Sequence, residues 1–395
     1  MKFCLLTTSF PVNSAKSRGG DAAYAEMLAK LMKDKGHEVH VIAYEMNDID
    51  DFTNENSIEI HKCITKYIPY ASTILPNIFQ AWQIFTFYRK LDSKIGFDVV
   101  EGSNNEGLMI WIALFARHKF SMRLHSSLKQ HILSKGNSFS YKHRFNVWLD
   151  KLAARVTRHL STHTEAHSKE MRKEYSLENR HVELIPHTVS VKQAFLQSCN
   201  DKAAPVTIGY IGSLDKRKGI DVLLKSVPIV LSGYPDAQFR IVGIDRGEAP
   251  GGGKYEDWYN NNIIKDKETR DRTEFCGFVS DELMGEVWRS LDILVVPSRY
   301  ESFGYVVIES FFHKRPVVIS DIESLTEVAS GAATVFKSED VEDLASKLID
   351  LLSKKDNWID LIDAGTQIYN EKYKLGIISN RLEKYFQNIV SNNQK

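Results

Sequence analysis

Residues 291–320 read LDILVVPSRYESFGYVVIESFFHKRPVVIS and give the clearest indication of how the chain folds. The apolar run at 291–296 predicts a buried strand, which ends at Pro297 because proline lacks the amide that a sheet ladder requires. From Gly304 the apolar residues are spaced as on one face of a helix, until Pro316 begins a second apolar run. The order strand, loop, helix, strand predicts an α/β fold with a parallel sheet.

The start of this predicted helix has the features of an anion site. It follows the carboxyl end of a parallel strand, so the amides of Gly304, Tyr305 and Val306 are available as donors to phosphate. Glu301 precedes the helix and Glu309 lies within it. A phosphate cradle between two acids suits a sugar nucleotide, with one acid for sugar hydroxyls and the other for the ribose. Two glutamates at this spacing are also common on solvated helix faces, so the spacing alone leaves both interpretations open.

Residues 297–309, PSRYESFGYVVIE, resemble the signature of retaining family-4 glycosyltransferases with the GT-B fold, and similarity extends over most of the chain. The resemblance implies two Rossmann-like, doubly wound domains that face each other across a cleft. It implies an acceptor-binding domain at 1–195, a sugar-nucleotide-binding domain at 196–370, and a C-terminal helix at 371–395 that crosses back to the first domain. Phe303, within the motif, is assigned by the resemblance to the donor site.

Length and composition are compatible with this fold and exclude other classes. A chain of 395 residues is too long for one compact core and suits two domains. Its 51 basic and 51 acidic residues balance, which argues against a nucleic-acid-binding protein. The four cysteines lack metal-binding or C-x-x-C spacing, which indicates reduced thiols in the cytoplasm. We expect no signal peptide and no membrane span, because the longest apolar run, 108–116, is far shorter than the ~20 residues required.

The first domain opens as a doubly wound fold. A predicted strand at 2–8 is followed by a glycine-containing loop at 9–21 and a helix at 22–35. Gly19 and Gly20 would let the backbone approach a diphosphate. In the similar enzymes a glycine pair at this place faces the donor phosphates; the alternative is that the pair only shapes a turn.

His125 follows a predicted strand at 120–124. The chain has 13 histidines, and any one of them is more often structural than functional. The resemblance places this one in the cleft, as a polar contact to the donor sugar or the acceptor.

Residues 129–175 are expected to be helical, with their many charges on a solvated face.

The second domain begins with a predicted strand at 206–211, followed by GSLDKRKG and a helix from Ile220. Three consecutive basic residues before a helix start suit a phosphate site, although an exposed basic turn would look the same. Lys218 matches the lysine that meets the donor diphosphate in the family. Ser213 stands where most relatives carry arginine. Either Arg217 supplies the missing charge or Lys218 acts alone; the sequence leaves both open.

A further loop corresponds to the nucleobase site of the family. Residues Phe278, Val279 and Asp281 occupy it after a predicted strand at 273–277. Base recognition there is largely through the backbone, so the nucleobase is not predicted.

Two stretches suggest additional ligands. Asp48 and Asp50 form the Asp-x-Asp pattern with which GT-A glycosyltransferases hold a metal, but a solvated acidic turn is the favoured interpretation. Residues 64–91 interleave aromatic and basic side chains. This pattern suits a lipid headgroup or lipid-linked acceptor, although a core helix is the simpler expectation.

Taken together, the sequence predicts a retaining glycosyltransferase that moves a hexose-type sugar from a UDP- or GDP-sugar to a hydroxyl of a glycan, glycolipid or small molecule. Its catalytic residues are expected to be His125, Glu301 and Lys218, with no metal or other cofactor. The resemblance implies same-face displacement. A sugar-nucleotide epimerase, a sugar phosphorylase and a non-catalytic sugar-nucleotide-binding protein remain as alternatives. The expected location is the cytoplasm, either without membrane contact or peripheral at the inner face of the membrane.

Overall fold

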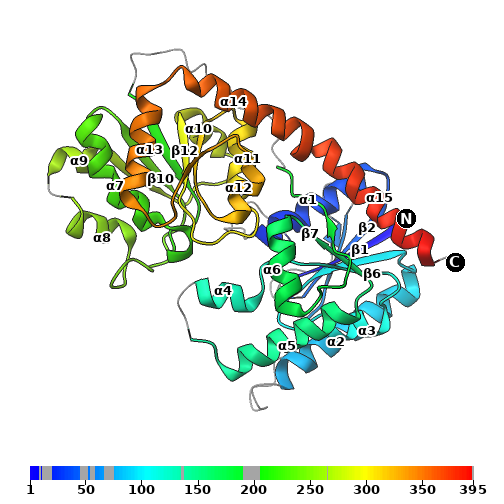
Figure 1. Cartoon of the computed structure of the whole chain (residues 1–395). Helices are drawn as coiled ribbons and strands as arrows, with labels where there is room; N and C mark the ends of the chain where they lie inside the picture. Colours follow the sequence, from blue (N-terminus) through cyan, green and yellow to red (C-terminus); the bar gives the residue numbers. More distant parts are fainter. Residues whose placement is uncertain are drawn as a thin grey trace. The chain divides into compact units, whose positions relative to one another are not determined.

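The chain forms two compact α/β units in a computed structural model (Figure 1). Unit 1 comprises Met1–His187 and Gly376–Lys395, and unit 2 comprises Thr188–Leu375. The predicted boundary at 195/196 lies outside the described residues. The structure describes residues 1–8, 10, 20–44, 52–53, 58–65, 75–134, 138–189, 205–264 and 266–393.

Unit 1 is built on an eight-stranded sheet with the order β3-β4-β2-β1-β5-β6-β7-β8. All neighbouring strands are parallel except β3, which pairs antiparallel with β4. The chain runs from β1 outward to β2 and β4, then returns to β5 on the other side of β1. The strands are β1 (Lys2–Thr7), β2 (Glu38–Ala43), β3 (Phe52–Thr53), β4 (Glu59–Lys62), β5 (Val99–Ser103), β6 (Phe120–Arg123), β7 (His159–Thr162) and β8 (Glu183–Leu184).

Helices cover both faces of this sheet, which explains why β1 is apolar at almost every position. Cys4 and Leu6 pack in one core, whereas Phe3 and Leu5 pack in the core on the opposite face. The helices of unit 1 are α1 (Gly20–Asp34), α2 (Leu75–Ile95), α3 (Ile110–Phe115), α4 (Leu128–Ser134), α5 (Tyr141–Val156), α6 (Glu165–Tyr175) and α15 (Leu375–Asn393).

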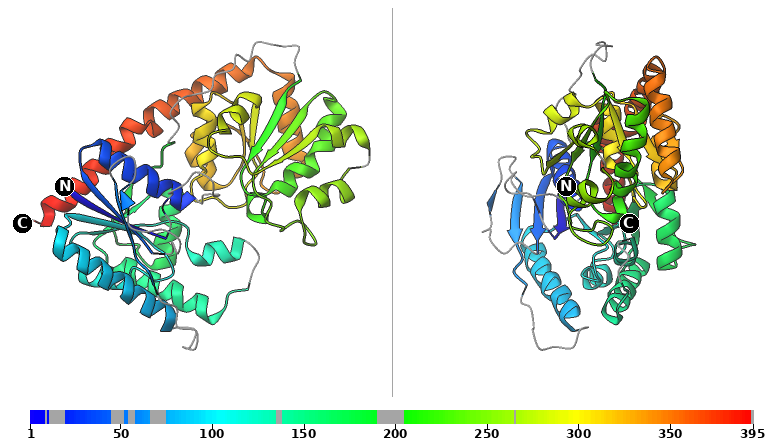
Figure 2. Two further views of the ribbon diagram at one scale, coloured as in Figure 1. Left: turned by 180° about the vertical axis from the view of Figure 1, so that it is seen from behind. Right: turned by 90° about the vertical axis from the view of Figure 1, so that its left-hand side faces the viewer.

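The C-terminal helix α15 packs on unit 1, as the family resemblance implies. Its residues Ile378, Leu382, Phe386 and Ile389 recur every three or four positions and are buried together. The ring of Phe386 lies edge-on to Phe3 on β1, with 4.9 Å between centroids. Figure 2 shows α15, in red, beside the blue strands of unit 1.

The region 129–175 differs from its prediction. It is not helical throughout, because β7 (His159–Thr162) lies within it as an inner strand of the sheet. Its polar side chains are also not simply solvated, since Asn146, Asp150 and His167 are buried. The short strand HLST has little apolar periodicity of its own; it is held by pairing with β6 and β8.

Unit 2 contains six parallel strands in the order β11-β10-β9-β12-β13-β14. The strands are β9 (Thr207–Ile211), β10 (Gln238–Val242), β11 (Thr273–Gly277), β12 (Ile293–Val296), β13 (Val317–Ser320) and β14 (Thr334–Phe336). The chain runs from β9 outward to β10 and β11, then returns to β12 on the other side of β9. The strand order therefore reverses between β9 and β12.

Helices lie on both sides of this second sheet (Figure 2). The predicted strand, loop, helix and strand at 291–320 are confirmed as β12, α11 and β13. The helical elements are η1 (Lys216–Lys218), α7 (Ile220–Gly233), α8 (Tyr255–Asn262), α9 (Lys267–Asp271), α10 (Met284–Ser290), α11 (Tyr305–Phe312), α12 (Glu323–Ala329), α13 (Val341–Ser353), α14 (Asn357–Ile368) and the π-turn η2 (Tyr369–Tyr373).

Two further expectations concern the membrane and the cysteines. Among the described helices, none is long and apolar enough to cross a membrane. Cys4, Cys63 and Cys276 are free thiols, and Cys199 lies outside the described residues.

Candidate functional site

The loops that follow β9 and β12 meet at the point where the strand order of unit 2 reverses. Open α/β sheets bind ligands at the carboxyl ends of strands on either side of such a reversal. Gly219, at the end of the first loop, has a φ of 66°. A Cβ there would lie 1.9 Å from the carbonyl oxygen of Pro297, at the start of the second loop. The two loops are therefore in direct backbone contact, and only glycine fits at position 219.

The basic loop after β9 is shaped by Asp215. Its carboxylate accepts hydrogen bonds from the backbone amide of Lys218 at 2.9 Å and from the hydroxyl of Ser213 at 2.6 Å. The guanidinium of Arg217 lies 3.6 Å from the same carboxylate. Asp215 thus caps the short helix η1 and orients the basic residues. The sequence analysis gave Asp215 no role, although an aspartate three residues before a helical amide is a common capping signal.

The structure brings Arg217, Lys218 and Glu301 together. The ammonium of Lys218 donates a hydrogen bond to Oε1 of Glu301 in an ion pair, and NH1 of Arg217 lies 3.8 Å from Oε2. The hydroxyl of Ser298 donates to Oε1 at 3.3 Å. The side chains of Lys218 and Glu301 are 21% and 9% exposed, so solvent screens their interaction only in part. This contact joins the two predicted motifs, which lie more than eighty residues apart.

Two serines hold the Glu301 loop against the rest of unit 2. Ser324, on α12, donates to the carbonyl of Glu301 at 2.6 Å, and Ser320, at the end of β13, donates to the carbonyl of Ser298 at 2.6 Å. The sequence analysis gave Ser324 no role. Its function as an anchor depends on a contact that no local pattern reveals.

Arg299 connects the Glu301 loop to helix α7. It forms a bidentate pair with Asp221 at 2.7 and 2.9 Å, donates to the carbonyl of Lys216 at 2.7 Å, and pairs with Glu339 at 2.7 Å. Burial raises the pKa of Asp221, but the hydrogen bonds from Arg299 outweigh burial and the pKa is lower than usual. Bidentate pairs of this kind fix geometry strongly, so Arg299 orients the loop.

Gly304 directly precedes helix α11 and has a φ of 91°. A Cβ at this position would lie 2.5 Å from Cδ2 of Leu325, so a side chain here would force the Leu325 side chain to move. The amides of Tyr305 and Val306 lie in the first turn, where the helix carries partial positive charge. Phe303 is 2% exposed. Its side chain therefore belongs to the core under the loop, and a ligand would meet its backbone.

Glu309 lies farther along α11 and is half-buried. Burial, and after it the charge of Asp281, raise its pKa to about 7, while the charge of Lys218 acts in the opposite direction. Asp281 belongs to the predicted nucleobase loop, so this loop is electrostatically coupled to Glu309. In the same loop Phe278 is 48% exposed, whereas Val279 packs against a small apolar cluster.

In unit 1, His125 follows β6 and is held by Asn104, which follows β5. The amide of His125 donates to Oδ1 of Asn104 at 2.6 Å, and Nδ2 of Asn104 donates to the carbonyl of His125 at 3.1 Å. Nδ1 of His125 lies 3.4 Å from Oδ1 of Asp21, on α1. Burial lowers the pKa of His125; Asp21 opposes this and Arg123 adds to it. The imidazole is therefore suited to polar contact as a neutral group.

The other predicted residues of unit 1 are placed as follows. Gly20 is the exposed first residue of α1, directly before Asp21. Gly19, Asp48 and Asp50 lie outside the described residues. The contact between Asp21 and His125 brings the start of α1 to the end of β6.

His125 belongs to a histidine cluster that the sequence analysis missed. His163 follows β7 and His187 follows β8, and one ring nitrogen of each of the three histidines lies within 4.8 Å of those of the other two. Burial lowers the pKa of both His163 and His187 well below the usual value. The buried guanidinium of Arg123 contributes in the same direction, so a metal ion at this cluster would meet a fixed positive charge. The strand order places these residues side by side, because carboxyl ends of parallel strands share one edge of the sheet.

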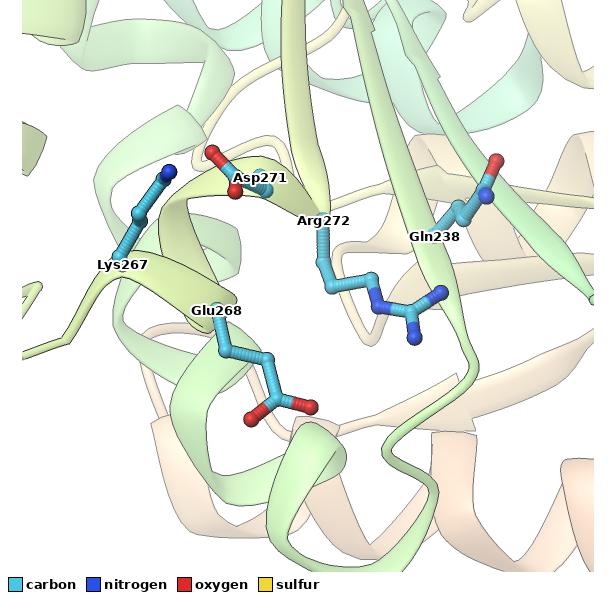
Figure 3. Close-up of a pocket in the computed structure, with 5 residues that line it drawn as sticks. All are labelled: Gln238, Lys267, Glu268, Asp271 and Arg272. Atoms are coloured by element: carbon cyan, nitrogen blue, oxygen red, sulfur yellow. The ribbon is translucent and has the colours of Figure 1, made fainter.

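One surface hollow lies elsewhere on unit 2 (Figure 3). It has a volume of about 580 Å³ and is lined by Gln238, Lys267, Glu268, Asp271 and Arg272. These residues lie at or before the amino ends of β10 and β11, opposite the edge that carries Lys218. Figure 3 shows Lys267 and Glu268 pointing in opposite directions, so the charges do not converge on a ligand.

We expect Gly219→Ala to destabilise unit 2 more than Gly251→Ala. Both glycines have positive φ, which costs an alanine about 1–2 kcal/mol, but a Cβ at Gly251 meets nothing within 4 Å. The clash with Pro297 should raise the loss for Gly219→Ala to about 2–5 kcal/mol. Urea unfolding of both variants measures the difference. Equal losses would show that the two loops are not in contact.

The raised pKa of Glu309 predicts a pH-dependent stability. The folded state holds this proton more tightly than the unfolded state, whose pKa is near 4.5. The stability that this group contributes is present at low pH and is lost as pH rises through about 7. Glu309→Gln should therefore gain stability relative to wild type between pH 5 and 8, as measured by thermal unfolding. The exposed Glu342→Gln serves as the control, and a parallel trend in both variants would contradict the assignment.

Comparison with known proteins places both units in one group of enzymes. Residues 18–193 match the family model for Glycosyltransferase Family 4, and residues 205–354 match the model for Glycosyl transferases group 1. An uncharacterised glycosyltransferase of Methanocaldococcus jannaschii is 23% identical over 352 residues, which cover 83% of this chain and 82% of that protein.

Solved structures show the same fold. The sucrose-phosphate synthase of Thermosynechococcus elongatus has a TM-score of 0.76 at 18% identity and covers 99% of this chain and 100% of its own. The HepE protein of Anabaena, solved in complex with UDP, has a TM-score of 0.69 at 14% identity, and the match covers 98% of this chain and 100% of the HepE chain. The chain is thus a glycosyltransferase with the GT-B fold and belongs to the family-4, group 1 type.

Proposed function

We propose that this glycosyltransferase moves a hexose-type sugar from a nucleoside diphosphate sugar, a UDP- or GDP-sugar, to a hydroxyl acceptor, with retention of anomeric configuration and without a metal. The observation that carries the proposal is the contact between Lys218 and Glu301 where the strand order reverses. In this contact Lys218, the proposed partner of the diphosphate, lies beside Glu301, the proposed partner of the sugar. The UDP bound to the HepE protein of Anabaena supports a nucleotide donor.

Donor binding should rearrange this ion pair. A diphosphate carries more negative charge and more acceptor atoms than one carboxylate, so it competes well for the ammonium of Lys218. Lysine has a flexible stem and can turn without moving the backbone. Once Lys218 contacts the diphosphate, Glu301 is available to accept hydrogen bonds from the sugar hydroxyls.

Arg217 is proposed as the second cation. The family resemblance places Ser213 where most relatives carry arginine, and its hydroxyl donates a hydrogen bond to Asp215. Arg217 lies beside the same carboxylate and near Glu301, so its guanidinium is in position to supply the missing charge. With Lys218 and the first amides of α11, it would stabilise the negative charge that develops on the leaving diphosphate. Fixed cations would then do the work that a metal performs elsewhere.

Glu309 is proposed to bind the ribose of the donor. Among the described residues its carboxylate makes no hydrogen bond, and it lies on α11, the helix whose first turn is proposed to bind the diphosphate. Two ribose hydroxyls offer two donors, which match the two oxygens of an ionised carboxylate. Donor binding would favour that ionised form despite the raised pKa.

Retention is proposed to proceed by same-face displacement. No carboxylate has a sequence context that distinguishes it as a covalent nucleophile. An oxygen of the leaving diphosphate would instead accept the proton of the acceptor hydroxyl as the new bond forms. His125, neutral and clamped by Asn104, would contact the sugar or the acceptor through its ring nitrogen.

The acceptor is proposed to be a glycan, glycolipid or small molecule, with lipid-linked acceptors favoured by α2. This helix buries Ala81, Ile84 and Phe85 in the core, as expected, but Trp82 remains 44% exposed. Exposed Lys90 lies on the same helix. The aromatic and basic side chains suit peripheral contact with an anionic membrane. Co-sedimentation with anionic vesicles at low salt tests this, and protein left in the supernatant would favour a soluble acceptor.

The activity is tested by incubating the protein with individual UDP- and GDP-sugars and measuring released nucleoside diphosphate. We expect slow hydrolysis of one donor, unchanged in EDTA, because the proposed charge stabilisation comes from side chains and amides. Release from no donor would contradict the transferase proposal. Loss of activity in EDTA, restored by Mg²⁺ or Mn²⁺, would contradict metal independence and return attention to Asp48 and Asp50.

Replacement of Glu309 and replacement of Glu301 are expected to change different kinetic parameters. Contacts of Glu309 with ribose change little during reaction, so Glu309→Ala should mainly raise the donor KM, by an amount corresponding to about 1.5–3 kcal/mol. Contacts of Glu301 with the sugar should strengthen as the ring gains positive charge, so Glu301→Ala should mainly lower kcat. Steady-state kinetics with one donor distinguishes the two. The opposite pattern would exchange the two assignments. If both variants had nearly normal kinetics, the stretch from Glu301 to Glu309 would not be the active site.

A further inference from the structure

A second group of metal-ligating side chains lies on strands β2 and β4 of unit 1. Each strand carries a glutamate followed two residues later by a histidine: Glu38 and His40 on β2, Glu59 and His61 on β4. The strands are parallel neighbours, and His40 is the register partner of Glu59. Residues two apart on a strand share a face, so all four side chains lie on one face of the sheet.

Three of these side chains converge on one point. Nδ1 of His40 lies 3.0 Å from Nε2 of His61 and 3.2 Å from Oε2 of Glu59, and Nε2 of His61 lies 3.8 Å from the same oxygen. A tetrahedral Zn²⁺ with ligand distances of about 2.0–2.1 Å separates its ligand atoms by about 3.3 Å. The triangle formed by the three atoms already has nearly the dimensions of a zinc site.

Glu38 determines which nitrogen of His40 faces this triangle. Its carboxylate lies 3.0 Å from Nε2 of His40 and accepts the proton of that nitrogen. The lone pair of the neutral ring is then on Nδ1, where it points to His61 and Glu59. A carboxylate behind a ligating histidine is the usual support of a zinc site. A proton on Nδ1 could form a hydrogen bond with only one of the two neighbouring atoms, Nε2 of His61 or Oε2 of Glu59. A divalent cation can bind Nδ1 and both of these atoms at once.

Burial and charge also suit a cation. The side chain of His40 is 2% exposed, so its ring is rigidly placed, whereas His61 is 14% exposed and Glu59 is 53% exposed. The open side gives a route for the ion and room for a water as fourth ligand. Glu38 and Glu59 together balance the charge of one divalent ion. This contrasts with the buried histidine cluster at His125, where Arg123 supplies positive charge.

We propose that His40, His61 and Glu59 bind one Zn²⁺, with Glu38 orienting His40, and that the ion ties β4 to β2. The pairing between these strands is short, with four register pairs, so a shared ion would add a cross-link near the edge of the sheet. The site lies on the face of the sheet rather than in the loops proposed for catalysis. It is independent of the proposed function.

The proposal is tested by titrating Zn²⁺ into the full-length protein after removal of metals with a chelator. We expect one equivalent to bind and to raise the melting temperature of the wild type. Glu59→Gln and His61→Gln should weaken this binding at least tenfold, and Glu38→Gln about 10- to 100-fold. Substitution with Co²⁺ should give visible absorption bands in the wild type that the Glu59 and His61 variants lack.

Two control variants distinguish Zn²⁺ binding at this site from Zn²⁺ binding at other histidines. His181 and Glu183 form an exposed pair at 2.9 Å, and the described part of the chain offers them no third ligand, so His181→Gln should bind Zn²⁺ as the wild type does. His163→Gln removes one member of the buried cluster and should also leave binding unchanged.

Several outcomes would overturn the proposal: no binding by the wild type, equal binding by Glu59→Gln and His61→Gln, or loss of binding only in His163→Gln. Glu59→Gln replaces an exposed side chain, so its unfolding in EDTA provides a check that it folds. Transferase activity of the metal-free protein is measured separately, which keeps failure of the zinc site distinct from failure of the proposed function.

Discussion

The ion pair between Lys218 and Glu301 is the interaction on which the candidate site depends. It joins the loop after β9 to the loop after β12, and the two loops also touch where Gly219 packs on Pro297. Asp215 fixes the first loop through its capping hydrogen bond. Without these contacts, the basic residues and the acids would belong to separate loops and could not act on one ligand.

Sheet topology makes this contact possible. The strand order in unit 2 reverses between β9 and β12, so the helices that follow these two strands lie on opposite faces of the sheet, while the loops before the helices meet at its edge. In unit 1 the order reverses between β1 and β5 in the same way. There Asn104, after β5, clamps His125 after β6, while Asp21 approaches from α1. In both units the candidate site residues follow strand ends, and the cores hold those strands in register.

Local signals explain what could be predicted. Pro297, Gly304 and the helical spacing beyond it act within a few residues, and they located β12, α11 and β13 correctly. The family resemblance added the fold and the candidate residues of both units. Contacts between distant segments escaped prediction, because the hydrogen bond from Ser324 to Glu301 and the register of His40 with Glu59 depend on tertiary structure. Strand β7 was missed because HLST has little pattern of its own and is stabilised by its neighbours.

The central claim is that Lys218 meets the diphosphate of the donor, and nucleotide binding tests it most directly. Isothermal titration of UDP and GDP compares wild type, Lys218→Gln and Lys216→Gln at one fixed salt concentration. Lys216 is adjacent and exposed, so it has the same charge without the contact to Glu301. The account predicts that Lys218→Gln weakens nucleotide binding at least tenfold, as expected for a charge-assisted hydrogen bond, while Lys216→Gln stays within about twofold of wild type. Equal weakening in both variants would mean that the loop contributes only general positive charge and would contradict the account.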